Sequence, residues 1–121
     1  MNRDLVLAEW RRAVESLRAA ELLAREKFPT DSVGKTYYAV LHAAKAALEV
    51  RDVGAESHSS VRRMFGLHLI RSGEIEDEWG RHLGRSLDER LAADYNPESD
   101  FSADQAREAC RLTRQDRKSV V

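Results

Sequence analysis

The sequence has a single cysteine, Cys110, among its 121 residues. An intramolecular disulfide is therefore excluded, and a zinc site built on cysteine thiolates is not expected. Residues that break helices are also scarce, with two prolines and six glycines in the whole chain. Long uninterrupted helices are therefore possible.

Long hydrophobic runs and an excess charge of one sign are both absent. No apolar run approaches the roughly 20 residues that a membrane-spanning helix requires. The first ten residues include Arg3, Asp4 and Glu9 and lack the apolar core of a signal peptide. We therefore expect a cytoplasmic protein without membrane contact. Twenty basic and 21 acidic residues leave a net charge of -1, so binding to nucleic acid would need a local basic patch.

Apolar residues recur at steps of three and four, which is the period of an amphipathic α-helix. The predicted helices run from Val6 to Ala24, from Val33 to Leu48, from about Ser59 to Arg71, from about Glu74 to Ala93, and from Ser102 into the fraying end near Lys118. We expect Pro29 to stop the first helix and Thr30, Asp31 or Ser32 to cap the second. Ser102 with Gln105 forms a capping-box pattern for the last helix.

These patterns predict an all-α protein with an up-and-down bundle of four or five helices. We expect one domain over residues 1–121, with its core at about 4–115. The second predicted helix contains many alanines, which would let neighbouring helices approach closely. It is therefore the expected centre of the bundle.

Three stretches, in one order, carry a resemblance to a known family. They are Lys35 to Ala46 (KTYYAVLHAAKA), the step Ser57-His58 at a predicted helix start, and Arg90 to Tyr95 (RLAADY). This combination resembles the UPF0332 branch of the HEPN superfamily, and the resemblance covers roughly residues 5 to 115. It implies a HEPN-like helical bundle that commonly forms a homodimer.

The resemblance also implies a function. Many HEPN proteins are metal-independent ribonucleases, often toxins encoded beside a minimal nucleotidyltransferase that acts as the antitoxin. Their usual signature is an arginine, four to six intervening residues and a histidine, and two copies meet across a dimer cleft. This sequence departs from that signature, because Tyr95 stands where the histidine is expected after Arg90 and no histidine follows.

The candidate catalytic residues are Arg90, Asp94 and Tyr95. Metal-independent RNA cleavage needs a base for the 2′-hydroxyl, an acid for the leaving oxygen and a cation for the phosphorane charge. Arg90 can supply the cation, whereas Tyr95 is a poor base at neutral pH. Asp94 can serve as a base, but its negative charge would also repel the phosphate. The structural alternative is a salt bridge between Arg90 and Asp94, with Tyr95 packed on the bundle.

The candidate nucleotide- or RNA-binding residues are Tyr38, His58 and Arg85. Tyr37 and Tyr38 point about 100° apart on a helix, so one is expected in the core and the other in a groove, able to stack on a base. His58 at a helix start can contact a phosphate, but it, Ser57 or Ser59 can equally act as a cap. Arg85 belongs to a series of arginines on the fourth helix that is either a basic stripe, a salt-bridged solvent face or a docking surface for an acidic partner.

The other histidines do not suggest a metal site. His42 is expected to be packed or at an interface, and His68 and His82 look isolated. None of them forms a metal-binding spacing such as H-E-x-x-H, so we expect no intrinsic metal and no cofactor.

The leading hypothesis is a HEPN component of a toxin–antitoxin or defence-type pair. It would be a dimer that binds a nucleotidyltransferase partner and holds RNA or nucleotide in its cleft. One alternative is a metal-independent endoribonuclease that uses Arg90 with Asp94, Tyr95 or the remote His58. In a further alternative, Tyr95 accepts a nucleotidyl group from the partner enzyme. In the last alternative, the chain is a non-enzymatic helical adaptor.

Overall fold

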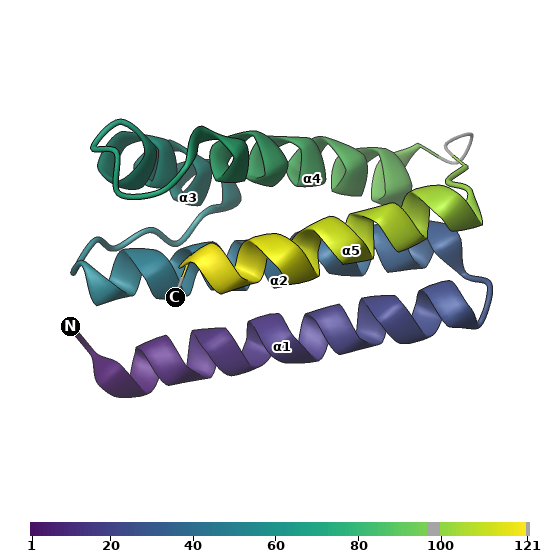
Figure 1. The fold of residues 1–121 in the computed structure, drawn as a ribbon, viewed down its shortest axis with the longest axis horizontal. Helices are drawn as coiled ribbons and strands as arrows, with labels where there is room; N and C mark the ends of the chain where they lie inside the picture. Colours follow the sequence, from purple (N-terminus) through teal and green to yellow (C-terminus); the bar gives the residue numbers. More distant parts are fainter. Residues whose placement is uncertain (97–99, 121) are drawn as a thin grey trace.

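The structure is a computed structural model that describes residues 1–96 and 100–120, with side chains for all of these except 92–95 and 116–120. The described elements are α1 (Arg3–Arg25), α2 (Pro29–Val50), α3 (His58–Phe65), a π-helical turn η1 (Gly66–Ile70), α4 (Asp77–Tyr95) and α5 (Ala103–Val120). Helices α1, α2, α4 and α5 run alternately up and down, and the short α3 lies beside the first turns of α4 (Figure 1). The predicted all-α bundle is confirmed, and the described ranges contain no strand.

The second predicted helix does lie at the centre of the bundle. Helix α2 contacts α1, α3, α4 and α5. Thirteen of its 22 residues are buried, including all five alanines between positions 39 and 47. Small side chains on several faces let four neighbours pack against one helix, which is why α2 can organise the core.

The turn from α1 to α2 differs from the prediction. Helix α1 ends at Arg25, and α2 begins at Pro29 itself, with Phe28 as a cap residue that makes no side-chain capping hydrogen bond. The predicted caps at Thr30, Asp31 or Ser32 are therefore wrong. Proline at the first helical position needs no partner for an N–H and has a helical φ, so it starts this helix.

Ser32 is instead buried in the interface between α1 and α2. Its hydroxyl donates a hydrogen bond to the Ala20 carbonyl oxygen over 2.7 Å. A short polar side chain in the first turn of α2 thus ties two helices together.

The third and fourth predicted helices are shifted slightly. Ser57 caps α3 by accepting a hydrogen bond from the Ser60 N–H at 3.1 Å, and the helical path continues through η1 to Ile70. Gly73, with φ of 80°, then reverses the chain. The Ile75 N–H donates to the Leu69 carbonyl at 3.0 Å, and α4 begins at Asp77, three residues later than predicted.

The capping box of the last helix is confirmed. The Ser102 N–H donates to Gln105 Oε1 at 2.7 Å, and the Gln105 N–H donates to Ser102 Oγ at 3.1 Å. The two residues satisfy each other's backbone donors, which is the reciprocal arrangement expected at a helix N-terminus.

Candidate functional site

A cluster of polar and aromatic side chains joins α2, α3 and α4. Tyr37 is buried, at 1% exposure, whereas Tyr38 is only partly buried, as the spacing on a helix predicted. Arg90 of α4 lies against both rings, with its Cζ 5.9 Å from the Tyr37 centroid and 5.7 Å from the Tyr38 centroid. Its Nη2 donates a hydrogen bond to Tyr38 Oη at 3.2 Å. These contacts fix the direction of the guanidinium.

His58 completes this group, because its ring lies 5.4 Å from the ring of Tyr37. We call Tyr37, Tyr38, His58 and Arg90 the arginine–tyrosine cluster. Ser57 performs the capping at the start of α3, so His58 is not needed as a cap. Burial lowers the pKa of His58, and the nearby Arg90 and Lys45 lower it further. The lowered pKa favours the neutral form of this partly exposed imidazole, which shares the Tyr37 ring with Arg90.

Further cations surround the cluster. Lys35 Nζ lies 5.8 Å from the Tyr38 ring centroid, on a ring that Arg90 also contacts. Lys45 lies close enough to act on the pKa of His58. His42 Nδ1 is paired with Glu9 Oε2 of α1 at 2.6 Å, which explains this histidine as a link between helices. The cluster thus has the positive charge that an anionic ligand requires.

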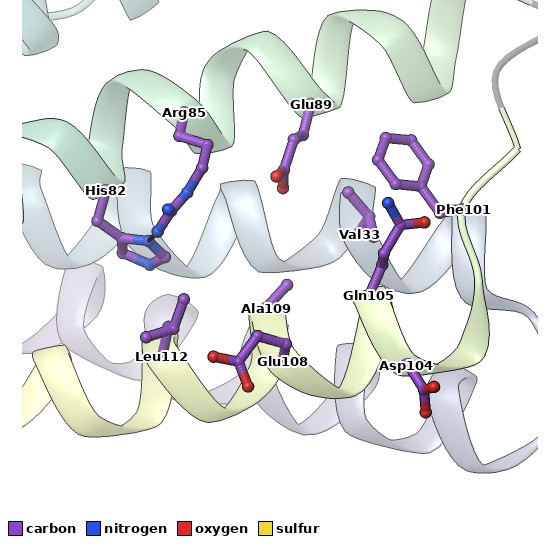
Figure 2. A pocket seen from close by; sticks show the side chains of 10 residues that line it. All are labelled: Val33, His82, Arg85, Glu89, Phe101, Asp104, Gln105, Glu108, Ala109 and Leu112. Carbon is purple, nitrogen blue, oxygen red and sulfur yellow. Dashed lines mark hydrogen bonds between the residues drawn. The ribbon is translucent and has the colours of Figure 1, made fainter.

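Arg85 is separated from the cluster and faces α5. It lines a cavity of about 310 Å³ between α4 and α5, together with Val33, His82, Glu89, Phe101, Asp104, Gln105, Glu108, Ala109 and Leu112 (Figure 2). Arg85 and Arg90 are five residues apart, so they project in different directions from α4. Of the three predicted binding residues, the structure brings together Tyr38 and His58 but not Arg85.

The expectation that His82 is isolated is wrong. His82 is 4% exposed, its Nε2 lies 3.1 Å from Thr113 Oγ1, and its Nδ1 lies 3.3 Å from Arg85 Nη2. Thr113 uses its own proton to bond the Ala109 carbonyl at 2.8 Å, so His82 donates from Nε2 and accepts at Nδ1. Burial and the nearby Arg85 lower the pKa of His82 to about 4.

Glu89 points into the same cavity (Figure 2). Burial raises the pKa of its carboxyl group, with Asp88 adding to the rise and Arg85 opposing it. The cavity therefore combines one guanidinium with carboxylates, so it is less suited to phosphate than the arginine–tyrosine cluster.

The two remaining candidates, Asp94 and Tyr95, lie in the last turn of α4. Their side chains are outside the described part of the protein, so the salt bridge and packing predicted for them stay predictions. Their roles beside Arg90 are likewise predictions.

A second basic surface, between α1 and α5, was missed from the sequence. It is a groove of about 840 Å³ whose basic lining residues are Arg25, Lys27, Arg107, Arg111 and Arg114. Three of these arginines are already paired with acidic side chains, namely Arg107 with Asp104, Arg111 with Glu108 and Arg114 with Glu21. The sequence did not predict this groove, because it forms only when two helices far apart in the chain pack together. In the sequence its basic residues also alternate with acidic ones, so they do not form a basic cluster.

The described ranges contain neither a cluster of metal-binding side chains nor a membrane-spanning helix. No group of three or more histidine, cysteine or acidic side chains there is arranged to hold a metal ion. None of the described helices is both long and apolar enough to span a bilayer.

The fold and the cluster define a class of small helical-bundle proteins that carry a polar site between helices. The HEPN domain pattern matches residues 7–116, nearly the whole sequence, so the chain belongs to the HEPN domain family. The resemblance seen in the sequence is thereby confirmed.

Similar proteins point to the same branch of the family. A Methanocaldococcus jannaschii protein named "Putative toxin" is 40% identical over 83 residues, 69% of this chain and 62% of that protein. A UPF0332 protein of Pyrococcus horikoshii is 42% identical over 78 residues, 64% of this chain and 55% of the relative. A UPF0332 protein of Gloeobacter violaceus is 37% identical over 84 residues, 69% of this chain and 67% of the relative. The chain thus spans less than two thirds of the length of the first two relatives.

Proposed function

We propose that this chain is the HEPN component of a toxin–antitoxin-type pair: a dimer that binds a minimal nucleotidyltransferase and holds an RNA or nucleotide phosphate on the arginine–tyrosine cluster. Two relatives from Methanocaldococcus jannaschii are named "Putative toxin". The observation that carries the proposal is the orientation of Arg90, whose guanidinium lies against two tyrosine rings and donates to Tyr38 Oη.

The geometry suits a phosphate in three respects. A guanidinium can make two parallel hydrogen bonds to phosphate oxygens. It binds phosphate more tightly when its orientation is fixed beforehand, because less conformational freedom is lost on binding. Lys35 and Lys45 add positive potential around it. Tyr38 is partly exposed and can stack on a base next to the bound phosphate.

RNA binding to the purified protein tests the proposal. We would measure the fluorescence anisotropy of labelled single-stranded and hairpin RNAs with the wild type, Arg90→Ala and Arg107→Ala. Arg107 is the matched control, because it is an exposed arginine on α5 in the competing groove. We expect Arg90→Ala to weaken binding at least about ten-fold, the value of a hydrogen bond to a charged group. Equal binding by Arg90→Ala and the wild type, or loss of binding in Arg107→Ala, would contradict the proposal.

The partner is tested separately. We would co-express the chain with a minimal nucleotidyltransferase from the same organism and determine masses by light scattering during gel filtration. The proposal predicts a dimer alone and a larger complex with the partner. A monomer that elutes apart from the nucleotidyltransferase would contradict this part of the proposal.

A second candidate function, RNA cleavage, is favoured by one arrangement: the His58 ring and the Arg90 guanidinium both lie against the Tyr37 ring, and burial lowers the pKa of His58. An imidazole that is neutral can act as the general base of such a reaction. In such a reaction His58 takes the proton of the 2′-hydroxyl and the 2′-oxygen bonds to phosphorus. The bond from phosphorus to the 5′-oxygen breaks, and that oxygen takes a proton from solvent.

The products would be a 2′,3′-cyclic phosphate and a 5′-hydroxyl end, formed in the presence of EDTA. We expect His58→Gln and Arg90→Ala each to abolish cleavage while the proteins keep their helical circular dichroism. Cleavage that persists in both variants would rule out this mechanism.

A further inference from the structure

The hydroxyl of Tyr37 is in an unusual position. Tyr37 is 1% exposed, and within the part of the chain that the structure describes its buried Oη has no hydrogen-bond partner. Leaving a buried hydroxyl without a partner destabilises a protein, and such a group in a native structure needs an explanation. Other buried hydroxyls here follow the rule: Thr36 Oγ1 donates to the Val33 carbonyl at 2.7 Å, and Ser32 Oγ to the Ala20 carbonyl.

The exception lies inside the arginine–tyrosine cluster. The Tyr37 ring is 5.4 Å from Tyr38 in an edge-on arrangement, 5.4 Å from His58 and 5.9 Å from the Arg90 Cζ. Arg90 and Tyr38 both act on the pKa of the Tyr37 phenol, so they lie near its hydroxyl. Tyr38 and His58 are only partly buried. They can therefore move aside for a ligand more easily than the core residues on the inner side of the ring.

We propose that the Tyr37 hydroxyl is a positioning donor for the bound ligand: it forms its hydrogen bond with an oxygen of the phosphate that Arg90 binds. This inference rests on the proposed function and adds a specific residue to it. Burial raises the pKa of Tyr37 to about 12, so the hydroxyl keeps its proton and remains a donor at neutral pH. An oxyanion is the acceptor that strengthens such a bond most.

The inference predicts opposite effects of one substitution on stability and on binding. Tyr37→Phe keeps the ring that supports Arg90 and His58 and removes only the hydroxyl. We expect its melting temperature to rise by about 3–6 °C, because the buried unpartnered group is gone. We expect its affinity for phosphate to fall about ten-fold, because the donor is gone.

Thr36→Val is the matched control. It removes a neighbouring buried hydroxyl whose hydrogen bond is already made in the free protein. We expect the melting temperature of Thr36→Val to fall and its affinity to equal that of the wild type.

The probes are a labelled twelve-residue oligouridylate and, in a second arm, AMP, followed by anisotropy and calorimetry. The arms distinguish an RNA phosphodiester from a nucleotide phosphate. Wild-type binding by Tyr37→Phe, while Arg90→Ala loses binding, would overturn the role of Tyr37 and leave the proposed function intact. A fall in the melting temperature of Tyr37→Phe would also overturn it, because the hydroxyl would then be partnered in the free protein. Failure of the wild type to bind either probe would instead contradict the proposed function.

Discussion

Acid should destabilise this protein through one buried residue, His82. In the folded state its Nδ1 accepts a hydrogen bond from Arg85, and its Nε2 donates to Thr113. A second proton would have to sit on Nδ1, against the guanidinium and in a buried environment. Burial first, and then the charge of Arg85, therefore lower the pKa of His82 from 6.5 to about 4.

The direction and size of the effect follow from this difference between the folded and unfolded states. The unfolded chain takes up a proton at pH values where folded His82 does not, so the stability is fully present above pH 6.5 and is lost as the pH falls toward 4. At pH 5 the unfolded histidine is almost fully protonated and the folded one only about one-tenth. The free energy of unfolding should then be about 2 kcal/mol lower than at pH 8 from this residue alone.

Urea unfolding at pH 5 and pH 8, followed by circular dichroism, measures the effect. In the wild type the free energy of unfolding should be lower at pH 5 than at pH 8. We expect this difference to be about 2 kcal/mol smaller in His82→Gln. The exposed His68 is the control, and His68→Gln should keep the full difference. Should His82→Gln fold poorly, an NMR titration of the wild-type imidazole replaces it. A pH dependence unchanged in His82→Gln, or an NMR titration of His82 near 6.5, would refute the reasoning.

Three further predictions concern stability alone and use thermal or urea unfolding. Phe65→Ala should lower the free energy of unfolding by about 3–5 kcal/mol, because Phe65 is fully buried. Leu67→Ala, at an exposed position, should change it by less than about 0.5 kcal/mol, and similar losses in both variants would contradict the packing. Gly66→Ala should stabilise the protein by about 0.5–1 kcal/mol, because an added Cβ meets nothing within 4 Å and the backbone there is helical; destabilisation would mean that the π-helical turn requires glycine. Ser102→Ala should cost about 1 kcal/mol through loss of the capping box, and an unchanged melting temperature would show that the cap does not contribute.

The helices were predictable from the sequence because their signals are local. Apolar spacing and the Ser102–Gln105 pair depend on residues within one or two turns of each other. The start of α2 was missed because a proline is compatible both with the end of one helix and with the first position of the next. The π-helical turn Gly66–Ile70 lies within the predicted third helix, and the apolar pattern does not distinguish a π-helical turn from an α-helical one.

The candidate site was predictable residue by residue but not as an arrangement. Tyr38, His58 and Arg90 were each singled out, yet Arg90 and Tyr38 are 52 positions apart and meet only through the packing of α4 on α2. The hydrogen bonds of His82 depend partly on Thr113, 31 positions away. The spacing of three between His82 and Arg85 was the one local signal that they share a helix face.

The most direct test of the central account is to locate bound RNA on the protein by NMR. We would record ¹H–¹⁵N spectra, including the arginine Nε–H region, during titration with the twelve-residue oligouridylate. The account predicts the largest shifts at Arg90 Nε–H and at the amides of Tyr38 and His58, with the α1–α5 groove unchanged. Shifts confined to Arg107, Arg111 and their neighbours on α5 would contradict it and place the RNA in the groove instead.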